Sequence, residues 1–273
     1  MSELSQQKQM SNSQNYVHLM LGSKGGIGKT FILCYLTDYL WSEGRVLSVI
    51  DTDTANVWLQ KAKHFKAITF NMYDSENLIS FEKIPEIFDM FTDRDLVIDT
   101  GANSYSAWRE YLVNGGAEEI KYRGLKLMLH VPVVPGSAFT ECVNCIEELV
   151  DLNFDCKYSI WLNNSAIAKS QSIKVEDFLA HPVFKKLEKY EPRITELPVC
   201  DPLHRRLVNE IHDNYYSLAE IANATPKELS KYTVFGRKLS IGDIVQAKYY
   251  QDKISSKLGS FINTRSFDVC CLK

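Results

Sequence analysis

Residues 16–30 read YVHLMLGSKGGIGKT, an apolar run of strand length that passes directly into a glycine-rich turn. A helical pattern then covers residues 28–43. Glycines let backbone N–H groups approach phosphate oxygens closely, and the N-terminus of a helix adds a favourable dipole. In such a loop Lys29 would contact the β and γ phosphates, and the Thr30 hydroxyl would ligate Mg²⁺. The stretch predicts a nucleotide-binding strand–loop–helix unit rather than a glycine-rich turn without a ligand.

Apolar segments of strand length alternate with helical patterns along the rest of the chain, which indicates βαβ units and a parallel sheet. The expected strands are Tyr16–Leu21, Val46–Asp51, Ala67–Asn71, Asp95–Asp99, Leu125–Val134, Tyr158–Asn163 and Arg193–Leu197. The expected helices are 28–43, 78–92, 104–115, 137–152 and 175–190, with another after Asp201-Pro202. We expect a P-loop NTPase fold of three α/β/α layers, with helices flanking a mostly parallel sheet.

Length and composition fit a single α/β domain with modest additions, because the chain has 273 residues and a net charge of −3. We expect a disordered polar lead-in over 1–15, a P-loop ATPase domain over 16–224 and a C-terminal helical appendage over 225–273. The lead-in has no apolar core of a secretory signal, and no apolar stretch approaches the ~20 residues of a membrane span. These features predict a cytoplasmic protein whose seven cysteines are reduced thiols.

The segment Lys24–Thr30, K-G-G-x-G-K-T, resembles the deviant Walker A loop of the ParA/MinD group of P-loop ATPases. Ser23 stands at the first glycine position of the ordinary motif. The resemblance implies that Lys24 reaches across an ATP-dependent homodimer to the phosphates of the other nucleotide, much as an arginine finger does. The other interpretation of Lys24 is an ordinary exposed loop lysine. The loop residues that the resemblance assigns to ATP or ADP are Gly25, Gly26, Ile27, Gly28, Lys29, Thr30 and Phe31.

Carboxylates end two of the expected strands, in Asp51-Thr52-Asp53 and at Asp99. Mg²⁺ is a hard ion that keeps several waters, so one direct hydroxyl with carboxylates nearby is suitable chemistry. The resemblance implies that Asp51 and Asp53 hold Mg²⁺ and position the attacking water, with the division between them open. It also implies that Asp99 is the Walker B carboxylate, which holds a Mg²⁺-bound water. Without the loop, Asp99 would be interpreted as a turn or cap residue.

The resemblance also locates a base pocket. Relatives place an asparagine against the adenine ring at the end of the strand that here closes with Asn163. Asn164 follows directly, so the choice between the two stays open, and either could simply start a turn. The segment around Pro198 matches the region where relatives complete the pocket with backbone contacts.

Over roughly residues 16–200 the chain is similar to the TraL-like proteins of conjugative plasmids, a ParA-like branch. The motifs that carry this similarity are Ile50–Asp53, Asn71–Asp74, Val97–Tyr105 and Trp161–Asn163. One departure follows the Walker B strand, where partition ATPases usually carry Thr-Pro-Pro or Thr-Ala-Pro and this chain has Thr100-Gly101-Ala102-Asn103. That segment senses the γ phosphate in relatives, and a glycine changes its backbone freedom. The resemblance therefore leaves open whether this chain responds to the γ phosphate as ParA and MinD do.

Two further features of the sequence are interpreted as structural rather than as binding sites. Cys142 and Cys145 lie on the apolar face of a helical pattern, so we interpret them as small buried hydrophobes rather than cluster ligands. Residues 227–273 hold nine Lys or Arg against four acids, which would suit DNA or an anionic membrane but is more often a solvated helix face. The apolar residues that would dock this tract on the core or on a partner are Ile241, Ile244, Val245, Ile254 and Leu258.

These observations leave three candidate functions. The first is a Mg²⁺-dependent ATPase switch that dimerises on ATP and acts, with a protein partner, in plasmid conjugal transfer or partition. The second is an ATP-binding module that hydrolyses little and recruits a transfer or secretion complex. The third, a metal-cluster or assembly ATPase, depends on the cysteine pair alone.

Overall fold

Seven parallel strands form the central sheet of the computed structural model, which describes residues 14–53, 55–56, 58–91, 93–165, 172–199 and 201–258. Their order is β3-β2-β4-β1-β5-β6-β7, and each neighbouring pair is parallel. The strands are β1 Tyr16–Met20, β2 Leu47–Asp51, β3 Ile68–Thr69, β4 Asp95–Asp99, β5 Lys126–Val133, β6 Lys157–Asn163 and β7 Arg193–Leu197. Each coincides with an expected strand to within a few residues, and the predicted parallel α/β/α architecture is confirmed.

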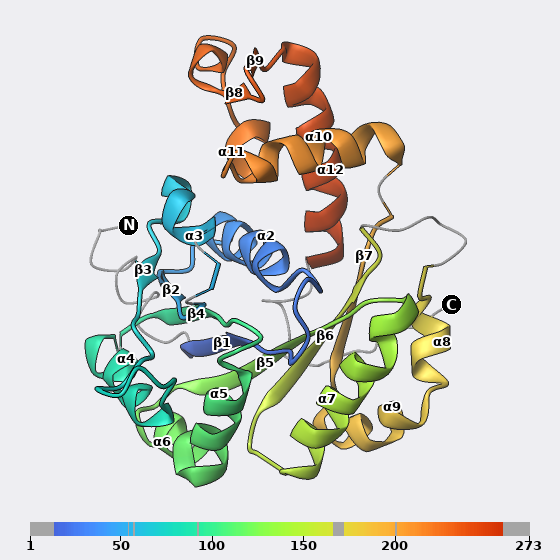
Figure 1. Cartoon of the computed structure of the whole chain (residues 1–273). Helices are drawn as coiled ribbons and strands as arrows, with labels where there is room; N and C mark the ends of the chain where they lie inside the picture. Colours follow the sequence, from blue (N-terminus) through green and yellow to red (C-terminus); the bar gives the residue numbers. More distant parts are fainter. Residues whose placement is uncertain are drawn as a thin grey trace, which may run out of the picture.

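Helices cover both faces of this sheet (Figure 1). The side chains of β1 alternate between the two faces, so Val17 and Leu19 belong to one hydrophobic cluster and Met20 to the other. The first cluster lies under α4 Pro85–Met90, α5 Tyr105–Tyr111, α6 Ala117–Tyr122, α7 Phe139–Asp151, α8 Val175–Leu179 and α9 Pro182–Leu187. The second lies under α2 Lys29–Ser42, α3 Trp58–Lys61, α10 Pro202–Asp213, α11 Leu218–Ala222 and α12 Ile241–Leu258.

Two of the expected helices are interrupted. The prediction of one helix over 175–190 is wrong, because His181 is extended at ψ 139° before Pro182 and separates α8 from α9. Proline disfavours the helical conformation in the residue before it. The helix expected over 104–115 ends as α5 at Tyr111, and a widened turn with Gly115 at φ 99° leads into α6.

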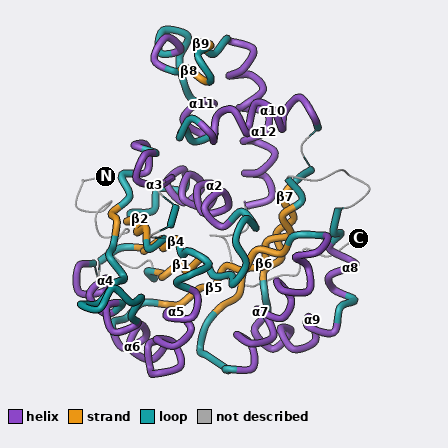
Figure 2. The backbone as a smooth tube through the Cα atoms, viewed as in Figure 1, coloured by secondary structure: helices purple, strands orange, loops and turns teal. Residues whose placement is uncertain are grey.

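The segment after α11 folds back over the α2 face as a hairpin and a long helix. The hairpin pairs β8 (Thr233–Val234) with β9 (Arg237–Lys238), and α12 follows it. Arg193 of β7 donates hydrogen bonds to the carbonyl oxygens of Lys257 (3.1 Å) and Leu258 (3.2 Å). These bonds satisfy carbonyls at the end of α12 and hold it beside the edge of the sheet, as Figure 2 shows.

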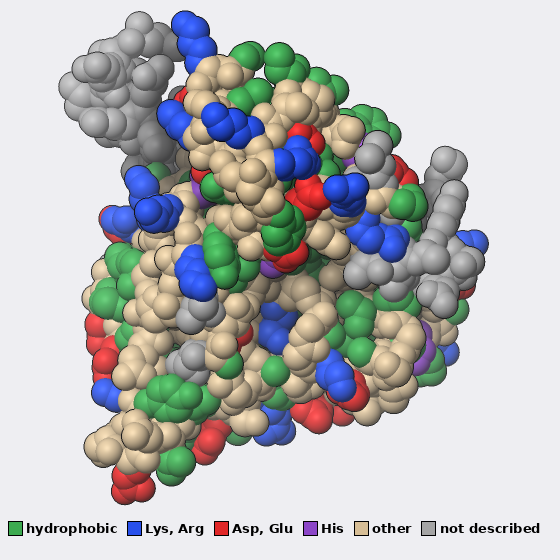
Figure 3. All heavy atoms as spheres, turned by 45° about the horizontal axis from the view of Figure 1, so that its top comes forward, with side chains coloured by type: hydrophobic (Ala, Val, Ile, Leu, Met, Phe, Trp, Pro, Cys, Tyr) green, Lys and Arg blue, Asp and Glu red, His purple; other side chains and the backbone are tan. Residues whose placement is uncertain are grey.

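The docking face of α12 differs in part from the expectation. Ile254 and Leu258 are buried, together with Ala247 and Tyr250, whereas Ile241 and Val245 are 60% and 62% exposed. Basic side chains are spread over this side of the molecule with acidic ones between them (Figure 3). Arg237, for example, pairs with Glu210 at 2.7 Å and Asp243 at 2.8 Å. Residues 1–13 of the lead-in and 259–273 of the appendage lie outside the described residues. Among the helices that are described, none has the length and apolar character that a bilayer crossing would need.

A polar chain runs through the middle of the sheet. The indole N–H of Trp161 donates to Nδ1 of His130 at 3.0 Å, so His130 carries its own proton on Nε2. That N–H donates to Nδ1 of His18, also at 3.0 Å. Burial lowers the pKa of His18 to about 4 and holds the pKa of His130 well below its usual value. Both histidines are therefore neutral, hydrogen-bonded core residues.

This pair makes the stability of the protein pH-dependent. Because the unfolded histidine binds a proton at a higher pH than the folded one does, the contribution of His18 to the free energy of unfolding should fall as the pH drops from ~6.5 towards ~4. The fall for His18 is on the order of 3 kcal/mol. Urea unfolding between pH 7 and pH 4.5 measures this slope. The contribution of His18 is the difference between the natural chain and His18→Asn, so the variant should lose less stability on acidification, and an equal slope in that variant would contradict the assignment.

Candidate functional site

The loop after β1 has the backbone that a phosphate-binding turn requires. Gly26 and Gly28 have φ angles of 74° and 88°, a conformation that favours glycine, and α2 starts directly after Gly28. A Cβ on Gly28 would also overlap Nδ2 of Asn163 at the end of β6. Leu21 N–H donates to the carbonyl of His130 at 2.9 Å, which ties the start of the loop to β5. The strand, loop and helix predicted from residues 16–43 are thus present in the predicted order.

Lys29 lies folded beneath this loop. It is 7% exposed, and its ammonium group donates to the carbonyl oxygens of Gly22 (3.2 Å) and Lys24 (3.0 Å). Burial lowers the pKa of Lys29, while the negative charges of Asp99 and Asp53 act in the opposite direction. A buried cation at the centre of a loop of backbone N–H groups is a suitable partner for phosphate oxygens.

The carboxylates expected to serve Mg²⁺ converge on Thr30. The Thr30 hydroxyl donates to Oδ2 of Asp99 at 2.6 Å, and Asp51 pairs with Asp99 across β2 and β4. Burial raises the pKa of Asp99 to about 7 and that of Asp51 to about 6. Oδ1 of Asp99 and Oδ2 of Asp51 are buried without a hydrogen-bond partner. Unpaired buried oxygens are costly, and hard oxygen ligands are what Mg²⁺ takes, so the residues fit this ion.

Within the described part of the chain, no three His, Cys, Asp or Glu side chains are arranged to hold a metal by themselves. The direct ligand expected from this chain is the Thr30 hydroxyl. The carboxylates then act through waters, which agrees with the reluctance of Mg²⁺ to lose its hydration shell.

Two threonines that were not predicted to be functional link the ends of β1, β2 and β4 by hydrogen bonds. Thr52 donates its hydroxyl to the carbonyl of Asp99 at 2.6 Å, and Thr100 donates to the carbonyl of Met20 at 2.5 Å. Trp108 of α5 donates its indole N–H to the Thr52 hydroxyl at 3.2 Å. The available signal was the Asp-Thr pair that ends both strands. These bonds join the two acidic segments to each other and to β1.

Lys24 lies at the surface beside α7. Its ammonium group is 3.0 Å from Oε1 of Glu141, and the two side chains are 44% and 50% exposed. An exposed pair of this kind contributes little stability, so it can open at small cost. Lys24 is thus held within its own chain by Glu141, a partner that the sequence did not reveal.

The two candidate asparagines have different surroundings. Asn163 donates from Nδ2 to the carbonyl of Ile27 at 3.0 Å, and its Oδ1 accepts the Ser165 hydroxyl at 2.6 Å. Asn164 is fully buried and bonds both the N–H and the carbonyl of Ile173 at 2.9 Å. Asn163 therefore lies against the phosphate loop, whereas Asn164 holds the backbone of Ile173, which precedes α8.

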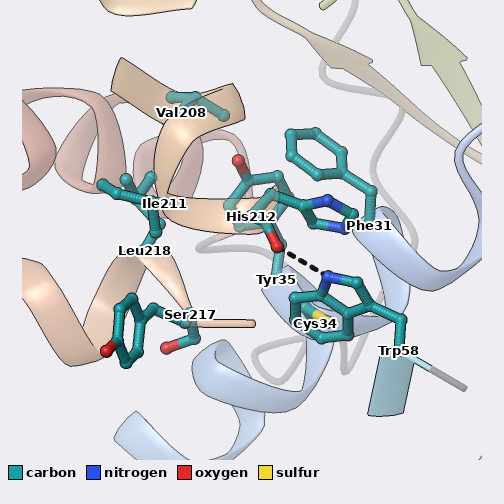
Figure 4. A pocket seen from close by; sticks show the side chains of 10 residues that line it. Phe31, Cys34, Tyr35, Trp58, Val208, Ile211, His212, Ser217 and Leu218 are labelled. Carbon is teal, nitrogen blue, oxygen red and sulfur yellow. Dashed lines mark hydrogen bonds between the residues drawn. The ribbon is translucent and has the colours of Figure 1, made fainter. Parts of the chain in front are cut away.

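The two remaining residues assigned to the nucleotide lie on the α10–α12 side. The carbonyl of Pro198 accepts the hydroxyl of Tyr250 in α12 at 3.0 Å. Phe31 packs edge-on against Tyr35, with ring centroids 4.6 Å apart, and against His212 at 5.7 Å. Figure 4 shows these rings around a small recess with Trp58, whose indole N–H donates to the carbonyl of His212 at 2.7 Å. The first residue of α2 that lines this recess is Phe31, which follows Thr30 directly.

Cys142 and Cys145 are both 2% exposed on the inner face of α7, as the plain interpretation of this pair predicted. Burial raises the pKa of each thiol. Their role in the described part of the chain is that of small core residues beside the loop.

Comparison with known proteins finds similarity to proteins named TraL and MobD. No protein-family model matches the chain. Two proteins named TraL from Escherichia coli are 27% and 28% identical over 151 residues, which is 54% of this chain. MobD of Acidithiobacillus ferrooxidans is 29% identical over 110 residues, 38% of this chain and 47% of MobD. The matched region spans 62% of the length of the TraL relatives.

Solved structures with a similar layout share little sequence. The MinD cell division protein of Aquifex aeolicus has a TM-score of 0.46 and 12% identity, covering 87% of this chain and 97% of MinD. FlhF complexed with GMPPNP and Mg²⁺ has a TM-score of 0.40 and 13% identity, covering 67% of each chain. At these scores neither likeness adds to what the strand order and the loop establish. The chain has the strand order and the glycine loop of a P-loop NTPase fold and is similar in sequence to the TraL proteins.

Proposed function

We propose that the protein is a Mg²⁺-dependent ATP-binding and hydrolysing switch. The observation that carries the proposal is the arrangement of Lys29, Thr30 and Asp99 at the start of α2, with two buried carboxylate oxygens that lack partners. Such oxygens next to a hydroxyl and a buried cation favour a metal–phosphate ligand over a site for a neutral molecule.

Each residue then has a distinct task. The N–H groups of the loop and the Lys29 ammonium bind the phosphates, and Thr30 with Asp51 and Asp99 would hold Mg²⁺. Mg²⁺, when bound, neutralises charge on the phosphates. Asp53 is the residue closest to solvent among the three carboxylates and is suited to orient the attacking water. Asn163, which also holds the loop through Ile27, and Pro198 border the base, and Phe31 contacts the nucleotide from the first turn of α2.

The resemblance to ParA/MinD proteins supports a homodimer that forms on ATP binding, with Lys24 acting across the interface. Lys24→Ala should therefore keep ATP affinity while losing both ATP-driven dimerisation and the turnover that depends on it. Sedimentation velocity with Mg²⁺ and a non-hydrolysable ATP analogue measures the dimer, and phosphate release measures the turnover.

Glu141→Gln is the matched control, because it removes the same ion pair and leaves Lys24 intact. That variant should dimerise at least as readily as the natural chain. Unchanged turnover in Lys24→Ala would remove the proposed role of this lysine.

The TraL and MobD similarities support a role in plasmid conjugal transfer or maintenance, through a protein partner of a transfer or partition complex. We place the protein in the cytoplasm, with DNA or an anionic membrane as further candidates for residues 227–273. An Asp53→Ala variant, loaded with ATP and used as bait in the native host, should trap the partner on the ATP-bound dimer. Equal recovery without ATP would count against a nucleotide switch.

The second candidate is an ATP-binding recruitment module with little hydrolysis. The departure at Thr100-Gly101 favours it, since a glycine changes the backbone freedom of the segment that senses the γ phosphate in relatives. ATP-driven dimerisation without turnover, even with candidate partners present, would support this function over the first.

A further inference from the structure

Gly101 lies at a point where side chains from two separate loops meet. A Cβ on this residue would lie 2.5 Å from Oδ1 of Asp53 and would also overlap Oδ1 of Asn103. Gly101 is not among the residues with positive φ, so space and not backbone conformation requires the glycine. The Thr100-Gly101 sequence, which differs from that of the partition ATPases, thus has a local steric reason.

Asp53 is held in this position by its neighbours. Its Oδ1 accepts the N–H of Ala55 at 3.1 Å, and its own N–H donates to Oδ1 of Asp51 at 3.0 Å. Its charge acts on Lys29, Asp51 and Asp99, which places it at the phosphate end of the site. The Asn103 amide, directed to the same point above Gly101, is therefore also at this end.

The segment that carries Asn103 is rigidly attached to the Walker B strand. Ser104 donates both its N–H (3.2 Å) and its hydroxyl (3.1 Å) to the carbonyl of Gly101, and α5 begins at the next residue. Asn103 itself is exposed. A polar side chain on a fixed turn, facing solvent beside a carboxylate, is suited to hold a water molecule.

We propose that Asn103 is a water-positioning residue of this ATPase site and that Gly101 provides the space in which it acts together with Asp53. The inference rests on the proposed function and names a residue that the resemblance does not supply. The Asn103 and Asp53 side-chain oxygens each accept one hydrogen of a single water. The water oxygen attacks the γ-phosphorus, the bond from that phosphorus to the β–γ bridging oxygen breaks, and ADP leaves with the electron pair. The proton lost by the water passes to Asp53.

The test compares Asn103→Ala, Gly101→Ala and the control Ser106→Ala, an exposed serine in the first turn of α5. Asn103→Ala should lower kcat about tenfold, the effect of one lost hydrogen bond, with KM unchanged. Gly101→Ala displaces both oxygens and should lower kcat on the order of 10²-fold. Ser106→Ala should match the natural chain in kcat, KM and thermal unfolding.

Two further readouts separate positioning from a structural role. Asn103→Ala should weaken binding of Mg²⁺–ADP–fluoroaluminate, which imitates the transferring phosphoryl group, and leave the affinity for a non-hydrolysable ATP analogue unchanged. In an Asp53→Ala background the same substitution should have little further effect, because both residues act on one water.

Equal loss of affinity for both analogues, or full additivity with Asp53→Ala, would overturn the inference. So would unchanged kcat in Asn103→Ala alongside lost turnover in Lys29→Ala, and this outcome would leave the proposed ATPase intact. A natural chain that binds Mg²⁺–ATP without hydrolysing it would overturn the inference and support the recruitment module. A natural chain that binds no nucleotide would overturn the proposed function as well.

Discussion

Lys29→Ala should reduce phosphate release from Mg²⁺–ATP by ~10²-fold or more, to the background of the assay. The ammonium group lies in the centre of the loop, bonded to the carbonyls of Gly22 and Lys24. In this site no other lysine is in the same position, since Lys24 points to Glu141 at the surface. Removing Lys29 therefore removes the cation that would contact the phosphates, and ATP affinity should fall together with turnover.

Lys185→Ala, an exposed lysine on α9, is the control for substitution of a lysine as such. It should leave turnover unchanged. Thermal unfolding should show that Lys29→Ala remains folded, because the buried apolar residues of α2 are unchanged. Turnover within twofold of the natural chain in a folded Lys29→Ala variant would mean that the loop is not the ATP site.

Asp95→Ala should lower the free energy of unfolding by ~3–5 kcal/mol. Asp95 begins β4 with its side chain fully buried, and Arg45 bonds both carboxylate oxygens at 2.7 Å. The N–H of Tyr16 donates to the same carboxylate at 2.8 Å, which joins β4 to β1. The substitution leaves the Arg45 guanidinium and this N–H without their buried carboxylate partner, and Arg45 keeps only its bond to the Gln14 carbonyl at 2.8 Å.

Asp93→Ala gives a matched comparison two residues earlier. Asp93 also pairs with an arginine, Arg94 at 2.8 Å, but its side chain is 71% exposed. Solvent screens this pair, so urea unfolding should detect no change. A small effect of Asp95→Ala in the same measurement would contradict the view that this ion pair stabilises the N-terminal ends of β1 and β4.

The sheet could be predicted because its strands are short, nearly continuous apolar runs separated by helical patterns, as in Leu96-Val97-Ile98. The helices were harder to predict from the sequence. Tertiary packing, not local pattern, decides which face of α12 is buried, because this helix packs against α10, α11 and the edge strand β7. The break at His181 could have been predicted from Pro182.

The candidate site was also predictable from the sequence only in part. The loop is contiguous in sequence, so Lys24 to Thr30 could be predicted together with the carboxylates that end β2 and β4. The contacts that set its geometry join distant residues, such as Trp108 with Thr52 and Lys24 with Glu141. The spacing of residues along the chain contains no signal for these pairs, and a fold is needed to bring them together.

Equilibrium binding of ATP to the natural chain, measured by calorimetric titration with and without Mg²⁺, tests the central claim most directly. The account predicts one ATP per chain, with an affinity that rises when Mg²⁺ is present and is lost in Lys29→Ala. Folded protein that takes up no ATP at millimolar concentration in the presence of Mg²⁺ would contradict it.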